Sequence, residues 1–193
     1  MIKGRIQHLP RGFTLIELMV VIAIITVTLV LAFPSFQTFQ RNAQLTSLAN
    51  SMIASINAAR SEAMKSGNAA MVKPNDGVNW SSGWVVFVDV ARTGLVKDNY
   101  SHILLQVPAV ASYITISATS TASGGTPYLM FDAQGYTSNT NASFTNVNFS
   151  LARNDVDATQ TGFETRRVIL SNTGKSRVCR PSTDTTCTAT ATS

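Results

Sequence analysis

The chain has 193 residues, of which 45% are hydrophobic and only 13% charged, a length that allows one segregated helix and one globular domain but excludes two ordinary domains plus an anchor. The low charge, with Ser, Thr and Asn enriched after Ala118, is typical of a secreted β-rich domain and not of a cytosolic enzyme. The net charge of +5 falls to about +2 when Lys3, Arg5 and Arg11 leave with a leader, so only a local basic cluster could bind nucleic acid.

A short basic leader, residues 1–12, precedes a long apolar run. The run covers residues 13–33, FTLIELMVVIAIITVTLVLAF, and contains one charge, Glu17. As a helix at about 1.5 Å per residue it spans roughly 30 Å, the thickness of a bilayer core. The basic leader stays cytoplasmic, so the rest of the chain is expected on the opposite side. A secretory signal has a shorter apolar core and is cut after it, whereas here the expected cut comes first, after Gly12.

The helical pattern continues over residues 34–67, which we expect to form an amphipathic extension of the membrane helix. Pro34 either kinks this helix, or simply ends its membrane-spanning part. Gly67 followed by Asn68 predicts the C-cap. The apolar stripe, which we expect to be core against the head, consists of Phe36, Phe39, Leu45, Leu48, Met52, Ile56, Ala59 and Ala63.

Residues 68–193 change to strand-like patterns and form the predicted head. The candidate strands are residues 70–73, 84–90, 103–107, 113–118, 128–131, 144–151, 166–171 and 175–180. The predicted fold class is therefore α+β. A long N-terminal helix, membrane-spanning in its first half, packs on a C-terminal antiparallel sheet or small sandwich.

No combination of residues predicts an enzyme, a metal site or a cofactor. His8 and His102 lie on either side of the expected cut, and His102 is expected at a strand edge. The acidic residues lack the spacing of an EF-hand. The segment Gly174-Lys175-Ser176 resembles the end of a phosphate-binding loop, but Ile169 stands where the earlier glycine is required and no helix is predicted after it.

Cys179 and Cys187 are the only cysteines. No histidine or second cysteine pair lies near them in sequence to complete a zinc site, so we expect a disulfide. In the chain-entropy model so short a loop contributes on the order of 2.5 kcal/mol, enough to hold down an otherwise frayed tail. The disulfide requires an oxidising compartment, such as a periplasm or the cell exterior.

A basic cluster surrounds the predicted C-terminal hairpin, with Glu164 and Asp184 as the nearby acids. Residues 172–174 read as a three-residue turn with Gly174 at a positive φ. Pairing then sets Ile169 opposite Arg177 and Arg167 opposite Cys179. Alternation along the strands directs one set of side chains to the core: Val168, Leu170 and Val178. It leaves on the outer face Arg167, Lys175 and Arg177, with Arg166 and Arg180 completing the cluster.

The segment Gly12-Phe13-Thr14-Leu15-Ile16-Glu17 resembles the class III prepilin signal, Gly-Phe-Thr-Leu-x-Glu, at every defined position. This resemblance implies that a prepilin peptidase cuts between Gly12 and Phe13 and methylates the amine of Phe13. Glu17 becomes the fifth residue of the mature chain. A carboxylate at the bilayer centre costs about 3 kcal/mol, and the resemblance implies that it pairs with the N-terminal amine of a neighbouring subunit. The alternative is an interfacial carboxylate without a role in assembly.

Two segments of the head, residues 83–89 (GWVVFVD) and 167–179 (RVILSNTGKSRVC), resemble the GspH/FimT family of minor pilins and pseudopilins. The resemblance covers nearly the whole chain and implies a type IV pilin-like fold. It implies a single-pass protein of the bacterial inner membrane, with its head in the periplasm, that later enters a pilus at the cell surface. Its expected partners are other pilin or pseudopilin subunits, the prepilin peptidase, the inner membrane and DNA.

The segment Gly174-Lys175-Ser176-Arg177 resembles the Gly-Arg-x-Arg motif that some FimT-like minor pilins use to bind DNA in natural transformation. Lys175 replaces the first arginine, which keeps the charge but loses the planar fork. The sequence thus predicts DNA binding, without sequence preference, through Lys175 and Arg177 with help from Arg167 and Arg180. The alternatives are a solvated basic face, and a GspH-like pseudopilin of a type II secretion system with a purely structural role.

Overall fold

The computed structural model describes residues 12–89, 102–157 and 159–190. Their regular elements, in chain order, are α1 (Leu15–Ser66), β1 (Ala69–Pro74), the 3-10 helix η1 (Trp80–Ser82), β2 (Trp84–Asp89), β3 (His102–Val107), β4 (Ile114–Ala118), η3 (Ser120–Ala122), β5 (Leu129–Phe131), β6 (Thr137–Ser138), β7 (Val147–Arg153), β8 (Thr165–Leu170) and β9 (Ser176–Cys179). Two compact units meet in the chain at Arg41, and each is described by itself. The leader residues 1–11 lie outside the described residues.

Helix α1 has local signals at both of its ends. The Thr14 hydroxyl accepts a hydrogen bond from the backbone N–H of Glu17 at 3.3 Å, as an N-cap does. At the other end, Gly67 has a φ of +69° and its N–H bonds to the Ala63 carbonyl at 3.0 Å, so the predicted C-cap is confirmed. The helix continues through Pro34. Pro34 therefore does not end α1, and its two interpretations, a kink or the end of the membrane-spanning part, both remain predictions.

The first unit consists of the apolar part of α1. By length and composition α1 is able to span a membrane, with a mean hydropathy of 2.8 over its most apolar 18 residues, none of them buried by the protein. Phe36 and Phe39 are also 62% and 71% exposed, so the expectation that the whole stripe is head core is wrong for these two residues. They precede Leu45, the first fully buried residue of α1.

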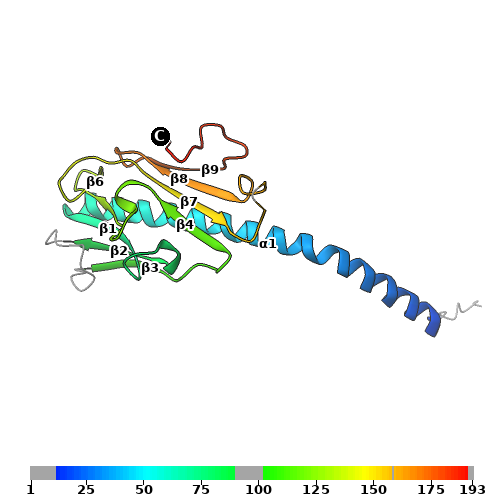
Figure 1. Ribbon diagram of the computed structural model, residues 1–193. Helices are drawn as coiled ribbons and strands as arrows, with labels where there is room; N and C mark the ends of the chain where they lie inside the picture. The colour runs from blue at the N-terminus through cyan, green and yellow to red at the C-terminus, as the bar shows by residue number, and fades with distance from the viewer. Residues whose placement is uncertain (1–11, 90–101, 158, 191–193) are drawn as a thin grey trace, which may run out of the picture. The chain divides into compact units, whose positions relative to one another are not determined.

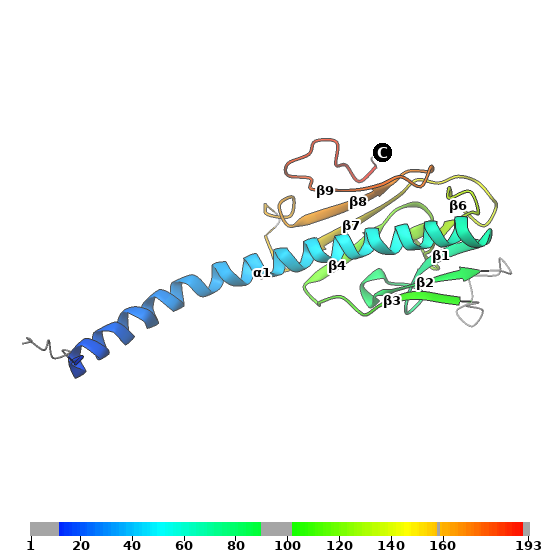
Figure 2. The ribbon, with the colours of Figure 1, turned by 180° about the vertical axis from the view of Figure 1, so that it is seen from behind.

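The second unit is the head, in which two antiparallel sheets share a core with the C-terminal part of α1 (Figures 1 and 2). One sheet has the strand order β3-β2-β1-β5-β6, and the other has the order β4-β7-β8-β9. Both contribute alternate apolar side chains to the core. The fully buried apolar residues that α1 adds are Leu45, Ala49, Met52, Ile56, Ala59 and Ala63.

Two tryptophans fix the head core. Trp84 lies in residues 83–89, the first of the two head segments that resemble the GspH/FimT family. It is fully buried and donates its indole N–H to the Ser55 hydroxyl of α1 at 2.8 Å. Trp80 packs edge-on against Phe149 of the other sheet, with ring centroids 4.9 Å apart. These contacts join both sheets and the helix. The predicted strands coincide with the observed ones within a few residues, except that the two-residue strand β6 is missed and that Val90 lies outside the described residues.

Arg60 of α1 joins two turns of the head. Its Nε donates to the carbonyl of Gly135 at 3.0 Å, and its Nη2 donates to the carbonyl of Thr173 at 3.1 Å. The turns approach so closely that a Cβ on Gly174 would lie 2.3 Å from the Gly135 oxygen. Gly174 also has a φ of +78°, so both its conformation and its surroundings require glycine.

Gly174→Ala should therefore destabilise the head by more than the backbone strain alone. The matched control is Gly77→Ala, because Gly77 has a φ of +81° with nothing within 4 Å of the added Cβ. We expect about 1 kcal/mol for Gly77→Ala and at least ~2 kcal/mol for Gly174→Ala, measured as the free energy of unfolding in urea. Equal effects of the two substitutions would show that the turns separate without cost.

Candidate nucleic-acid interface and assembly residues

The predicted processing and assembly residues lie together at the N-terminal end of α1. Gly12, Phe13 and Thr14 precede the helix, and the Phe13 side chain is 83% exposed. Glu17 lies in the first helical turn, where the helix dipole favours a negative charge. These four residues line one open hollow. The Gly12–Phe13 peptide bond is thus outside the helix, and the Glu17 carboxylate lies within one turn of it.

The predicted register of the C-terminal hairpin is confirmed. Strands β8 and β9 pair Arg167 with Cys179 and Ile169 with Arg177. The turn closes with the Gly174 N–H bonded to the Ser171 carbonyl at 2.9 Å. On the inner face, Val168 and Leu170 are fully buried and Val178 packs against the same core.

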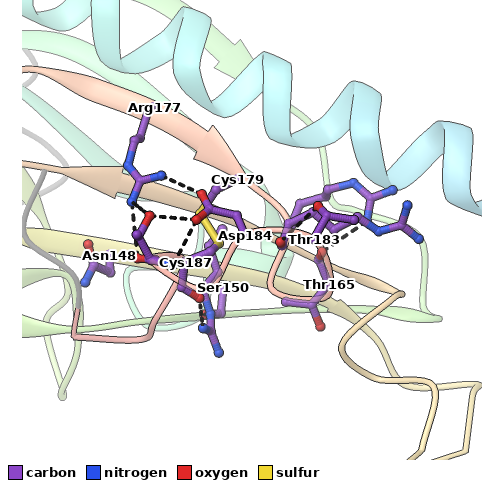
Figure 3. The surroundings of a disulfide bond; sticks show 12 residues. Asn148, Ser150, Thr165, Arg177, Cys179, Thr183, Asp184 and Cys187 are labelled. Carbon is purple, nitrogen blue, oxygen red and sulfur yellow. Dashed lines mark hydrogen bonds and ion pairs between the residues drawn. A yellow bond between two sulfur atoms is a disulfide. The ribbon is translucent and has the colours of Figure 1, made fainter.

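A C-terminal strap, residues 180–190, covers the outer face of this hairpin (Figures 1 and 3). The disulfide between Cys179 and Cys187 anchors it, as the sequence predicts. The two cysteines bury Ile169 completely, although this residue points to the outer face. The outer face that carries Arg167 and Arg177 is therefore partly covered, because the strap returns across it.

Arg177 is bound by the strap. Its Nη1 forms a salt bridge with Asp184 at 2.8 Å, and its Nη2 donates to the carbonyl and hydroxyl of Thr186 at 3.2 and 3.1 Å. Figure 3 shows Arg177 directed toward Asp184 beside the disulfide. Both side chains of the pair remain about one third exposed, at 32% and 33%. A phosphate could thus reach Arg177, but it would compete with the Asp184 carboxylate.

Asp184 keeps its negative charge at neutral pH. Hydrogen bonds from the hydroxyl and backbone N–H of Thr186, and then from Arg177, lower the pKa of Asp184 below its ordinary value. A carboxyl group with a lowered pKa stabilises the fold above its unfolded pKa of about 3.9, and this contribution disappears as the pH falls through the folded pKa. The contact between strap and Arg177 is therefore complete at neutral pH and is lost only in acid.

Arg167 also lies under the strap. It donates through Nη1 to the carbonyl of Cys187 and through Nε to the Ser150 hydroxyl at 3.3 Å. Asn148, on the neighbouring strand β7, holds the strap further along by donating to the Ala189 carbonyl at 2.8 Å. Arg167 is thus a partly buried structural contact as well as a candidate cation for DNA.

The other two predicted DNA-binding cations, Lys175 and Arg180, lie apart from Arg167 and Arg177. Lys175 is exposed, directly after the turn. Arg180 follows β9 and donates through Nε to the Phe163 carbonyl at 3.0 Å, next to Arg166. The structure thus brings Arg167 and Arg177 together under the strap, and places Arg180 with Arg166 in a separate pair.

Sequence reasoning does not identify the role of Asp184. The sequence nevertheless contains an indication of this contact, because Asp184 lies between the two cysteines, inside the loop that the disulfide closes. So short a loop must fold back along β9, and this brings Asp184 to the strand that carries Arg177.

Two families match the sequence. Residues 48–174 match the family described as Type II transport protein GspH. Residues 9–33 match the prokaryotic N-terminal methylation motif, which includes the predicted cleavage bond and Glu17. No curated protein gives a significant match.

Solved structures with the same fold include a minor pilin and a minor pseudopilin. The type IV minor pilin FimU of Pseudomonas aeruginosa has 21% identity and a TM-score of 0.56, over 75% of this chain and 94% of the solved chain. The minor pseudopilin EpsH from the type 2 secretion system of Vibrio cholerae has 14% identity and a TM-score of 0.50, over 72% of this chain and 98% of the solved chain. At these identities the similarity establishes the fold alone.

Proposed function

Since this chain belongs to the GspH family of type II transport proteins and carries the N-terminal methylation motif, it is a type IV pilin-like minor pilin or pseudopilin, and we propose that it acts as a FimT-like minor pilin that binds extracellular DNA. Its apolar N-terminal helix fits a membrane-anchored subunit. The DNA would be held without sequence preference and taken up in natural transformation. The proposal assigns the protein no catalytic role.

The observation that carries the DNA-binding proposal is the concentration of basic residues around the C-terminal hairpin. Five cations lie at or beside it, against two nearby acids, and one of these acids, Asp184, forms a salt bridge with Arg177. The other acid, Glu164, is buried and forms its salt bridge with Arg153, which lies outside the cluster. Such a local excess of positive charge attracts the phosphates of nucleic acid. The five cations are Arg166, Arg167, Lys175, Arg177 and Arg180.

Each N-terminal segment of the chain has a proposed role in processing, membrane anchoring or filament assembly. A prepilin peptidase removes residues 1–12 and methylates Phe13, while residues 13–33 hold the protein in the inner membrane with the head in the periplasm. During assembly the apolar helix leaves the lipid for the core of the filament. Glu17 then pairs with the N-terminal amine of a neighbouring subunit, which satisfies a carboxylate in an apolar environment.

The second candidate is a structural pseudopilin of a type II secretion system. One observation favours it: Asp184 and the strap carbonyls already satisfy much of the hydrogen-bonding capacity of Arg177 and Arg167. On this interpretation the two arginines fasten the strap to β8 and β9, and the head contacts other minor subunits only.

DNA binding by the mature chain in detergent separates the two candidates. The parent should bind a labelled duplex weakly, with a log-log salt slope of about −2 to −4, because three to four phosphate contacts are available. Lys175→Ala combined with Arg177→Ala should flatten that slope by about two and lower transformation.

Lys175→Arg should bind at least as tightly as the parent, since a guanidinium suits a phosphate better than an ammonium does.

Asp184→Asn is the matched variant with the opposite expected sign. It removes the carboxylate that competes for Arg177 and leaves the disulfide intact, so binding should tighten about two- to fivefold at low salt. If the double alanine variant binds and transforms like the parent, and Asp184→Asn changes nothing, the pseudopilin function takes the place of DNA binding.

A further inference from the structure

Arg166 and Arg180 of the basic cluster lie side by side on the head, at the Phe163 carbonyl. Arg166 of β8 donates from Nη1 and Arg180 donates from Nε to the same carbonyl oxygen, that of Phe163, at 3.1 and 3.0 Å. Arg166 is further fixed by a bond from its Nε to the Thr46 hydroxyl of α1 at 3.2 Å. Both guanidinium groups are thus held against one point of the head surface.

The charges of this pair are only partly balanced by the protein, through the electrostatic effect of Glu164 on Arg166. Within the described residues, neither Arg166 nor Arg180 forms a salt bridge. The nearest carboxylate in sequence, Glu164, is occupied by Arg153 at 3.3 Å and by the side-chain amide of Asn42 at 2.7 Å. Partial burial, and next the charge of Arg180, lower the pKa of Arg166, and the charge of Glu164 opposes them only in part. Two like charges held this closely are stabilised by an anion that contacts both.

Guanidinium hydrogen-bond donors and an aromatic ring remain available at the pair of Arg166 and Arg180. Among the described residues, no protein acceptor binds Nη1 or Nη2 of Arg180, or Nη2 of Arg166. The ring of Phe163 is 50% exposed, and the Arg180 guanidinium carbon lies 5.9 Å from its centroid. Exposed aromatic rings beside cations are the elements on which single-stranded nucleic acids bind, because bases stack while phosphates pair.

We propose that Arg166 and Arg180 together bind one phosphodiester group of single-stranded DNA, and that an adjacent base stacks on Phe163. This site lies apart from Lys175 and Arg177 and rests on the proposed DNA-binding function. A duplex keeps its bases stacked internally and cannot use the Phe163 ring. The site therefore gives the head a preference for single strands, which the hairpin cations alone do not provide.

The test measures binding of the mature chain in detergent to a labelled oligothymidylate and to a duplex of the same length. Phe163→Leu should weaken binding of the single strand about five- to tenfold and leave duplex binding within about twofold. Its control is Phe144→Leu, which alters a phenylalanine 59% exposed elsewhere on the head and should change neither. Arg180→Gln should weaken binding of the single strand about tenfold, and Arg180→Lys should retain part of it.

Lys65→Gln is the charge-matched control for Arg180→Gln, because the Lys65 side chain is 79% exposed at the end of α1. If Arg180→Gln matches Lys65→Gln, the pair is no phosphate site, while binding through Lys175 and Arg177 still stands. If Phe163→Leu weakens both probes equally, or neither, the stacking platform is absent. If the parent binds neither probe, the proposed function fails as well. Binding to anionic vesicles that depends on Arg180 would then assign the pair to a membrane.

Discussion

Gly12→Ala, or substitution by a bulkier residue, should leave all of the protein as uncut precursor in the membrane. We propose that a prepilin peptidase cuts the bond between Gly12 and Phe13, which lies outside α1 and inside the matched methylation motif. Among the described residues, a side chain at residue 12 meets nothing within 4 Å, so we expect the substitution to leave the head intact and to act on recognition by the peptidase. Immunoblotting of membranes would show one band, heavier than the mature chain.

Gly4→Ala provides the control for this result, because Gly4 is a leader glycine that no Phe-Thr-Leu-x-Glu sequence follows. It should be processed like the parent. Normal processing of the Gly12 variants would contradict the assignment of the cleavage bond.

Glu17→Ala should be processed and inserted but almost absent from filaments. The substitution removes the carboxylate that we propose as the buried partner of a neighbouring amine, and the unpaired amine would then be costly to bury. Because Glu17 is exposed in the single chain, the substitution leaves the head unchanged. Comparison of sheared filaments with membranes by quantitative immunoblotting measures the effect, and a loss of at least about tenfold is expected.

Thr28→Val is the matched control, since it changes a polar residue further along the same apolar segment. The Thr28 hydroxyl donates to the Ile24 carbonyl within the helix at 2.8 Å, so its hydrogen bond is already satisfied inside the subunit. This variant should enter filaments normally. Equal recovery of Glu17→Ala and the parent would identify Glu17 as an interfacial carboxylate without a role in assembly.

Local signals explain why most of the fold can be predicted from the sequence. The turn chemistry of residues 172–174 and the alternation of apolar residues determine the register of β8 with β9, and both are local properties. The same holds for the start and end of α1. The stripe through Phe36 and Phe39 is different, because periodicity identifies an apolar face but not what covers it.

The candidate nucleic-acid interface is less predictable because it depends on long-range contacts. Alternation correctly assigns Arg167 and Arg177 to one face, but it does not reveal that the strap returns across them and brings Asp184. The pair of Arg166 and Arg180 arises only when β8 and β9 align beside the Phe163 carbonyl. Such contacts can be predicted only from the tertiary fold, because no spacing in the sequence indicates that these residues come together.

The central claim is that this chain enters a filament as a processed, pilin-like subunit through its N-terminal helix. Mass spectrometry of the protein recovered from sheared filaments tests this most directly. The account predicts a chain that begins at Phe13 with a methylated amine and contains the Cys179–Cys187 disulfide. A filament-associated chain that begins at Met1, or beyond Ile25 within the apolar segment, would contradict it.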